Sequence, residues 1–183
     1  MIKKDIFSTE LEGLYVVERK KFVDNRGWFD KLFCAEALSD IPNFQIKQIN
    51  ISYTEKQGTV RGMHLQAAPY AEKKIVTCIE GSVLDIVIDL NRHSMTYKKI
   101  FKLELNAEKQ NSLIIPEGFA HGFQTLSDSC KLVYAHSQEY SPNSETGVNI
   151  RDERVLGHWP LPIRNLSKRD MKLPLIKEFE KRN

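Results

Sequence analysis

Two histidines in glycine-rich surroundings are the first residues of this chain that could do chemistry. His64 lies in Arg61-Gly62-Met63-His64-Leu65-Gln66, and His121 lies in Pro116-Glu117-Gly118-Phe119-Ala120-His121-Gly122-Phe123. Glycine lets the backbone turn tightly and leaves room for a ligand, and the pKa of imidazole near neutrality suits proton transfer. A histidine on a plain apolar strand is more often a core residue, so packing stays the alternative for both.

The same two histidines raise the question of a metal ion. Pro116 to His121 has the Pro-x-Gly-x-x-His spacing of the second cupin motif. A metal cupin needs roughly three or four ligands, typically a His-x-His pair and a downstream carboxylate. The matching place here is His64-Leu65-Gln66, and glutamine is a poor replacement for imidazole. We therefore predict no metal.

The cysteines support neither a disulfide framework nor a thiolate zinc site. Cys34, Cys78 and Cys130 are odd in number and far apart, without a Cys-x-x-Cys pair. We expect reduced, mostly buried thiols.

The elements that must position these residues are predominantly strands. Short alternating or β-branched runs separated by turn residues are typical of a sandwich or barrel. The predicted strands are Gln45–Tyr53, Lys74–Cys78, Ser82–Leu90, Lys99–Leu105, Ser112–Ile115, Gly122–Leu126 and Lys131–His136. Glu80-Gly81 predicts a hairpin, and Ser82–Leu90 should be covered on both faces. Peripheral helices are predicted at Asp30–Ser39 and from Ser167 to about Lys181, where Pro174 must break the helix or begin another.

Length and composition favour a single domain over residues 1–183. A hydrophobic content of 41% is ample for one core. The net charge of +3 comes from 27 basic and 24 acidic residues mixed along the chain, without the basic face of a nucleic-acid-binding protein. Met1–Asp5 leads into mixed polar sequence rather than a signal peptide, and no run of 18 apolar residues occurs. We predict a cytoplasmic protein with no nucleic-acid or membrane partner.

The motifs taken together resemble one family, the dTDP-4-dehydrorhamnose 3,5-epimerases, which are dimeric cupins that work without a cofactor. The resemblance covers nearly the whole chain and implies an all-β cupin jelly-roll barrel with a few short peripheral helices. It also implies a homodimer, for which Leu11–Phe22 is a candidate segment to cover a partner's sheet edge. The matching motifs are Asp24-Asn25-Arg26-Gly27-Trp28-Phe29, Gln48-Ile49-Asn50, Arg61 to Gln66, Lys74-Ile75-Val76, Asp85 to Asp89, Ile115 to Phe123, Tyr134 and Tyr140-Ser141-Pro142.

The resemblance implies a metal-independent epimerase of a nucleotide-diphosphate 4-keto-sugar, acting at C3, C5 or both. Removing a proton beside the C4 ketone gives an enolate, and returning a proton to the other face inverts the carbon. Such a reaction would serve the biosynthesis of a deoxy- or heptose sugar of a surface polysaccharide, as in lipopolysaccharide or capsule. We favour dTDP-4-keto-6-deoxyglucose slightly over a GDP-linked 4-keto-heptose or 6-deoxyhexose, and CDP-linked sugars stay open.

The resemblance assigns four catalytic residues. His64 would be the base, with Asp170 on its second nitrogen. Tyr134 would return a proton from the opposite face, and Lys74 would stabilise the charge on the keto oxygen. The implied substrate-binding residues are Arg26 and Arg61, which would hold the diphosphate, and Phe29, Gln48, Asn50, His121 and Tyr140, which would line the sugar or nucleotide pocket.

Each of these roles has a structural alternative. Ser167-Lys168-Arg169-Asp170 fits a capping box in which Asp170 only begins a helix. Lys74 could be a solvated strand lysine, Tyr134 an ordinary strand aromatic, and Arg26 a turn residue.

Two further carboxylates, Asp85 and Asp89, alternate with apolar residues on one predicted strand. Like carboxylates in such positions more often pair with neighbouring strands or face solvent, so we leave both out of the site.

Four places depart from the family's pattern. Thr77 and Ala135 stand where the family commonly has arginine and lysine, Ile150 stands where it has tryptophan, and Ser94-Met95-Thr96 replaces a Ser-Pro-Thr turn. Because two cations and an aromatic are lost, we expect these differences to affect nucleotide and sugar recognition.

Two other functions compete with the epimerase: a non-catalytic cupin that binds a sugar nucleotide, and a metal-dependent cupin oxygenase or isomerase. Retention of the base, the acid and the lysine together favours the enzyme, because a mere binder gains little from them.

Overall fold

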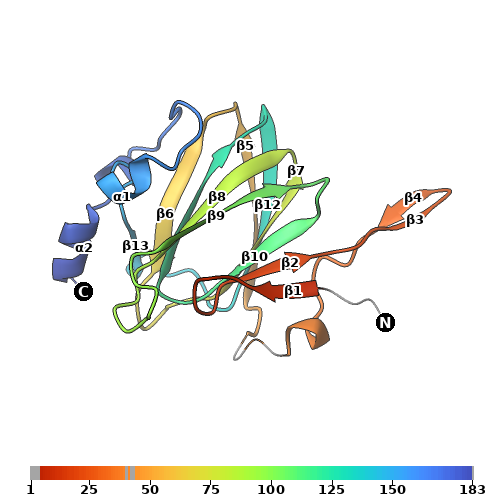
Figure 1. Ribbon diagram of the computed structural model, residues 1–183, viewed down its shortest axis with the longest axis horizontal. Helices are drawn as coiled ribbons and strands as arrows, with labels where there is room; N and C mark the ends of the chain where they lie inside the picture. Colours follow the sequence, from red (N-terminus) through yellow and green to blue (C-terminus); the bar gives the residue numbers. More distant parts are fainter. Residues whose placement is uncertain (1–4, 40, 42–43, 183) are drawn as a thin grey trace.

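The protein is described here by a computed structural model covering residues 5–39, 41 and 44–182, and it consists of two facing antiparallel sheets, a projecting hairpin and short helices (Figure 1). Residues 1–4, on which the prediction about a signal peptide rests, lie outside this range. The strands are β1 (Asp5–Ser8), β2 (Tyr15–Glu18), β3 (Phe22–Asp24), β4 (Gly27–Phe29), β5 (Gln48–Glu55), β6 (Val60–Gln66), β7 (Lys74–Glu80), β8 (Ser82–Asp89), β9 (Ile100–Asn106), β10 (Asn111–Ile115), β11 (Phe119–Thr125), β12 (Ser129–His136) and β13 (Glu145–Gly147). The helices are the 3₁₀ turns η1 (Glu36–Leu38) and η2 (Asp170–Lys172), and α1 (Glu153–Leu156) and α2 (Ile176–Arg182).

The strands form a six-stranded sheet in the order β1-β2-β10-β7-β12-β5 and a five-stranded sheet in the order β13-β6-β11-β8-β9. All seven predicted strands are present, with ends that differ by a few residues. The all-β jelly-roll barrel predicted from the sequence is confirmed.

β8 is covered on both of its faces, as predicted, and it separates two of the three apolar clusters of the described core. Val83 and Val87 point between the two sheets, where they join a cluster with Leu113 and Phe123. The alternate residues Ile86 and Ile88 point to the other face and pack against the C-terminal segment, which supplies Val148, Val155 and Ile176. The alternation of side chains along one strand thus places β8 in the middle of the molecule.

The predicted hairpin at Glu80-Gly81 is wrong. β7 and β8 do follow one another there, but they belong to different sheets, so the chain crosses from one sheet to the other at this point. Gly81 has a φ of +75°, and a Cβ at this position would lie 2.1 Å from the carbonyl oxygen of Ser129. The corner therefore requires glycine for both its backbone conformation and its lack of a side chain.

The helix predicted at Asp30–Ser39 is also wrong, apart from the single 3₁₀ turn Glu36–Leu38. The Asp30 carboxylate accepts a 2.8 Å hydrogen bond from Nε of Arg19, which ties this segment to the barrel instead. In the C-terminal segment the predicted break at Pro174 is confirmed, because it separates η2 from α2.

The hairpin of β3 and β4 was not predicted, and it projects away from both sheets (Figure 1). Its large apolar side chains Phe22, Val23, Trp28 and Phe29 are exposed. Within the described part of the chain, no helix has the length and apolar character needed to span a membrane.

Candidate active site

A cavity of about 740 Å³ lies between the two sheets and the C-terminal segment. Its wall includes nine of the eleven residues that the sequence predicted for the site: His64, Asp170, Tyr134, Lys74, Gln48, Asn50, Arg61, His121 and Tyr140. Arg26 and Phe29 are not among its lining residues. Strands from both sheets contribute, so residues that are far apart in the sequence meet at one surface.

His64 and Asp170 form a hydrogen-bonded pair at the cavity. Nε2 of His64 lies 2.9 Å from Oδ1 of Asp170, and the N–H of Gly62 donates to the other carboxylate oxygen at 3.3 Å. Burial alone would raise the pKa of Asp170, but these hydrogen bonds and the nearby His64 lower it to about 2. The carboxylate is therefore ionised at neutral pH, places the imidazole proton on Nε2 and leaves Nδ1 as the basic nitrogen.

The capping-box interpretation of Asp170 holds only for its backbone. The backbone N–H of Asp170 donates to Oγ of Ser167 at 3.0 Å, whereas the carboxylate binds His64 and Gly62. Because the cap uses the backbone of Asp170, the carboxylate is free to bind His64.

Glycine is required where β6 and β11 carry the two motif histidines. His64 and His121 are direct cross-strand partners. Gly62 has a φ of +124°, and a Cβ here would lie 2.5 Å from the Cα of Gly122. The two strands can approach this closely only because both positions lack a side chain.

Tyr134 and Lys74 come from neighbouring strands of the six-stranded sheet. The Tyr134 hydroxyl lies 3.0 Å from Oγ of Ser52, and burial raises the pKa of this phenol, so it stays protonated at neutral pH. Nζ of Lys74 lies 3.1 Å from the Glu72 carboxylate, and both side chains are buried. A phenol proton and an ammonium group thus face the same cavity as His64.

His121 has a carboxylate partner that the sequence analysis left out. Its Nε2 lies 2.7 Å from Oδ2 of Asp85, which is fully buried and whose pKa is raised by that burial. Asp85 therefore pairs with a neighbouring strand, since β8 lies beside β11, which is one of the two outcomes expected for it from the sequence. Asp89 does not line the cavity and accepts a 2.8 Å hydrogen bond from Thr96 instead.

Two arginine side chains, Arg61 and Arg169, line the cavity. Arg61 is held by Oγ1 of Thr54 at 2.9 Å and by the carbonyl oxygen of Tyr53 at 3.1 Å, with further N–H groups to offer a ligand. Arg169, which the sequence analysis missed, pairs with Glu145 at 2.9 Å and lies 3.4 Å from Nε2 of His64. Its position next to Asp170 in the sequence was the available signal.

The other two predicted residues, Arg26 and Phe29, lie on the projecting hairpin. The Arg26 guanidinium, 84% exposed, binds the Asp24 carboxylate two residues away, as the turn interpretation expected. Phe29 is also exposed. The structure therefore does not bring these two residues to the cavity of their own chain.

Three of the departures from the family's pattern lie away from the cavity. Thr77 and Ala135 point from β7 and β12 to the face opposite Lys74 and Tyr134, where Thr77 bonds to Ser112 and Ala135 packs in an apolar cluster. Ile150 is a core residue. These three residues therefore do not line the cavity of their own chain, and their effect on nucleotide and sugar recognition stays a prediction.

The sequence profile of the dTDP-4-dehydrorhamnose 3,5-epimerases matches residues 8–178. The chain belongs to this family. A curated relative, the dTDP-4-dehydrorhamnose 3,5-epimerase of Shigella flexneri, is 33% identical over 168 residues and covers 91% of this chain and 93% of its own. The resemblance inferred from the motifs is confirmed, and so is the enzyme class, an epimerase that acts on a sugar nucleotide.

Two solved structures of the same fold contain sugar nucleotides. The dTDP-6-deoxy-D-glucose 3,5-epimerase of Legionella pneumophila, in complex with dTDP-4-keto-L-rhamnose, has a TM-score of 0.88, 30% identity, and coverage of 95% of this chain and 93% of its own. A 3'-monoepimerase of Streptomyces bikiniensis, in complex with dTDP-quinovose, has a TM-score of 0.87, 28% identity, and coverage of 94% and 88%.

Proposed function

We propose that this protein epimerises a nucleotide-diphosphate 4-keto-sugar by removing a proton beside the C4 ketone and returning one to the opposite face. The observation that carries this proposal is the His64–Asp170 pair, which shares one cavity with Tyr134 and Lys74. Nδ1 of His64 takes the proton, and the ionised Asp170 stabilises the imidazolium that results.

The other two groups complete the reaction. Tyr134 is protonated at neutral pH, as an ordinary phenol is, and it faces the cavity, so it can deliver its proton to the enolate carbon. The Lys74 ammonium stabilises the negative charge on the C4 oxygen, an interaction that is strongest away from bulk water. No step requires a redox change, since the carbon loses and regains a proton only.

The side chain of Gln66 supports the prediction that no metal takes part. Its amide nitrogen donates to the carbonyl oxygens of Tyr70 at 3.1 Å and Glu139 at 3.2 Å, and its oxygen accepts from the N–H of Ser141 at 2.7 Å. Gln66 is thus committed to holding a loop and does not take the place of the second histidine of a metal-cupin pair.

The favoured substrate is dTDP-4-keto-6-deoxyglucose. The reaction would take place in the cytoplasm and would serve the synthesis of a deoxy sugar for a surface polysaccharide. The dTDP-sugars in the Legionella and Streptomyces structures support dTDP over GDP as the nucleotide of the substrate. The same two relatives differ in being a 3,5-epimerase and a 3'-monoepimerase, so inversion at C3 alone stays an alternative to inversion at both carbons.

We also propose a homodimer in which the β3–β4 hairpin reaches the partner's cavity. This would bring Arg26 and Phe29 to a substrate despite their distance from their own cavity. The edge strand β5 offers an apolar face for such contact, because Ile49, Ile51 and Tyr53 are exposed by 62%, 67% and 50%. An uncovered edge with such a face favours association with a second chain.

The test is turnover of 4-keto-sugars linked to dTDP, GDP and CDP, followed by NMR of the sugar ring. Inverted product with dTDP at the highest kcat/KM is expected, and the coupling constants will identify C3, C5 or both. Binding of a sugar nucleotide without any inversion would leave the non-catalytic binder as the function. Turnover that depends on an added divalent metal would favour the metal-dependent cupin.

A further inference from the structure

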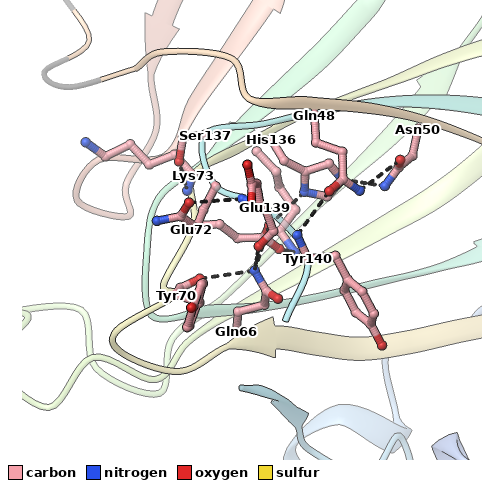
Figure 2. Close-up of polar contacts among 12 residues, drawn as sticks. Gln48, Asn50, Gln66, Tyr70, Glu72, Lys73, His136, Ser137, Glu139 and Tyr140 are labelled. Carbon is pink, nitrogen blue, oxygen red and sulfur yellow. Dashed lines mark hydrogen bonds and ion pairs between the residues drawn. The ribbon is translucent and has the colours of Figure 1, made fainter. Parts of the chain in front are cut away.

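The cavity contains a third histidine–carboxylate pair, His136 with Glu72, in addition to those of His64 and His121. Nδ1 of His136 lies 2.8 Å from Oε2 of Glu72, and both side chains line the cavity (Figure 2). His136 stands two residues after Tyr134 on β12, so both point to the same face, and their rings are stacked with centroids 6.0 Å apart. Neither His136 nor Glu72 has a role in the reaction proposed above.

This pair lies within a continuous chain of hydrogen bonds whose direction can be worked out. The chain starts at the backbone N–H of Tyr140, which can only donate, and which bonds to Oε1 of Gln48 at 3.0 Å. The Gln48 amide nitrogen must then donate, and it lies 3.0 Å from Oδ1 of Asn50. Nδ2 of Asn50 in turn faces Nε2 of His136 at 3.4 Å, so this imidazole nitrogen is the acceptor.

The tautomer of His136 follows from this direction. With Nε2 accepting, the proton of the neutral ring sits on Nδ1 and is donated to Glu72. Figure 2 shows Gln48, Asn50, His136 and Glu72 in this sequence of contacts. A proton on Nε2 would require the two amides to reverse and would leave the N–H of Tyr140 facing another donor.

The far end of the chain is Lys74. Oε1 of Glu72 lies 3.1 Å from Nζ of Lys74, while Oε2 binds His136 and, at 3.3 Å, the amide nitrogen of Gln66. Burial alone would raise the pKa of Glu72, but the hydrogen bond from His136 and the charge of Lys74 lower it, so the carboxylate is ionised. His136 therefore fixes the anion that holds the ammonium group in place.

We propose that His136 is a positioning residue of the reaction: as its Nδ1–H tautomer it orients the Glu72 carboxylate, which holds the Lys74 ammonium toward the C4 oxygen of the substrate. The proposal rests on the proposed function of Lys74. This role differs from substrate binding, because His136 acts on the substrate only through Glu72 and Lys74.

Three replacements of His136 separate positioning from packing. Phenylalanine keeps the ring and its stacking on Tyr134 but removes both hydrogen bonds. Asparagine places an amide nitrogen close to the position of Nδ1 and can still donate to Glu72, whereas glutamine reaches only the position of Nε2. We expect His136→Phe and His136→Gln to lower kcat by about 10- to 100-fold, the range for misplacing a reacting group, with KM little changed. His136→Asn should recover most of kcat.

Glu72→Gln should lower kcat by a similar factor, and adding His136→Phe to it should cause little further loss, because both act through one path. His93→Asn, at an exposed histidine away from the cavity, is the matched control and should behave as the wild type. Equal losses in His136→Phe and His136→Asn, or a loss confined to KM, would overturn the proposal.

The tautomer is tested without any substrate by imidazole ¹⁵N NMR, with the His136 signals assigned by their absence in His136→Asn. At neutral pH, a protonated Nδ1 and an unprotonated Nε2 are expected, and a proton on Nε2 contradicts the directed chain. Absence of turnover in the wild type would overturn the proposed function, whereas full activity of His136→Phe in an active enzyme would overturn only the role of His136.

Discussion

Replacing Asp170 by asparagine removes a charge and changes the hydrogen-bond pattern while keeping the size of the side chain. The native carboxylate accepts from both His64 Nε2 and Gly62 N–H. If the asparagine oxygen accepts from Gly62, its NH₂ group faces Nε2 of His64, which must then become the acceptor. The imidazole proton moves to Nδ1, and the basic nitrogen is lost.

The expected loss in catalysis is about 10³- to 10⁴-fold in kcat, the range for putting a catalytic histidine into the wrong tautomer. A loss in stability accompanies it. The difference between the ordinary pKa of 3.8 and the value of about 2 in the folded protein corresponds to about 2 kcal/mol of stabilisation at neutral pH. Because the folded pKa is the lower one, this stabilisation is complete above pH 4 and disappears as the pH falls to about 2.

Both effects are measurable on the same protein. Rates of proton exchange and inversion give the loss in kcat, dTDP titration shows whether the cavity survives, and urea unfolding at pH 7 and near pH 2 gives the stability difference. Asp128→Asn, which removes one charge at an exposed position away from the cavity, is the control. Native-like turnover in Asp170→Asn would refute the role of the carboxylate, and equal destabilisation at both pH values would refute its ionised state.

Three other replacements test separate parts of the account. Tyr134→Phe should still remove the ring proton but lose most of the inversion. Hydrogen exchange at the ring carbons measures proton removal, and NMR of the product measures inversion. Equal losses of exchange and inversion would contradict the role of Tyr134 as the acid. Gly62→Ala should lower the free energy of unfolding, measured in urea, by about 3 kcal/mol or more, because the added Cβ would lie 2.5 Å from Cα of Gly122. A smaller decrease would show that the two strands can move apart. Arg26→Gln should raise KM about tenfold or more, and mixing it with the inactive His64→Asn variant should restore low-KM activity in mixed dimers; no recovery would contradict a shared site.

The strands were predictable because alternation of apolar and polar side chains is a local property. The position of β8 between two apolar layers followed directly from its nearly continuous apolar sequence. The sheet to which a strand belongs is not local, and for this reason β7 and β8 were wrongly joined as a hairpin. The segment after Asp30 was wrongly predicted as a helix because its partner Arg19 lies 11 residues earlier, directly after β2.

Only part of the site could be predicted from the sequence. Asp170 lies 106 residues from His64, and only the family resemblance joined the two. His136 was missed although it shares a strand face with Tyr134, and Glu72, which stands two residues before Lys74, was missed as well. Spacing by two residues was the available signal, but their convergence depends on the pairing of β12 with β7, where His136 lies opposite Lys74.

Hydrogen exchange at the sugar ring tests the central claim most directly, because proton removal by His64 is the step that separates an epimerase from a binder. The wild-type protein is incubated in heavy water with dTDP-4-keto-6-deoxyglucose, and the sugar is examined by mass spectrometry and NMR. The account predicts deuterium at C3, C5 or both, and none in His64→Asn under the same conditions. A wild-type protein that binds this sugar nucleotide but introduces no deuterium would contradict it.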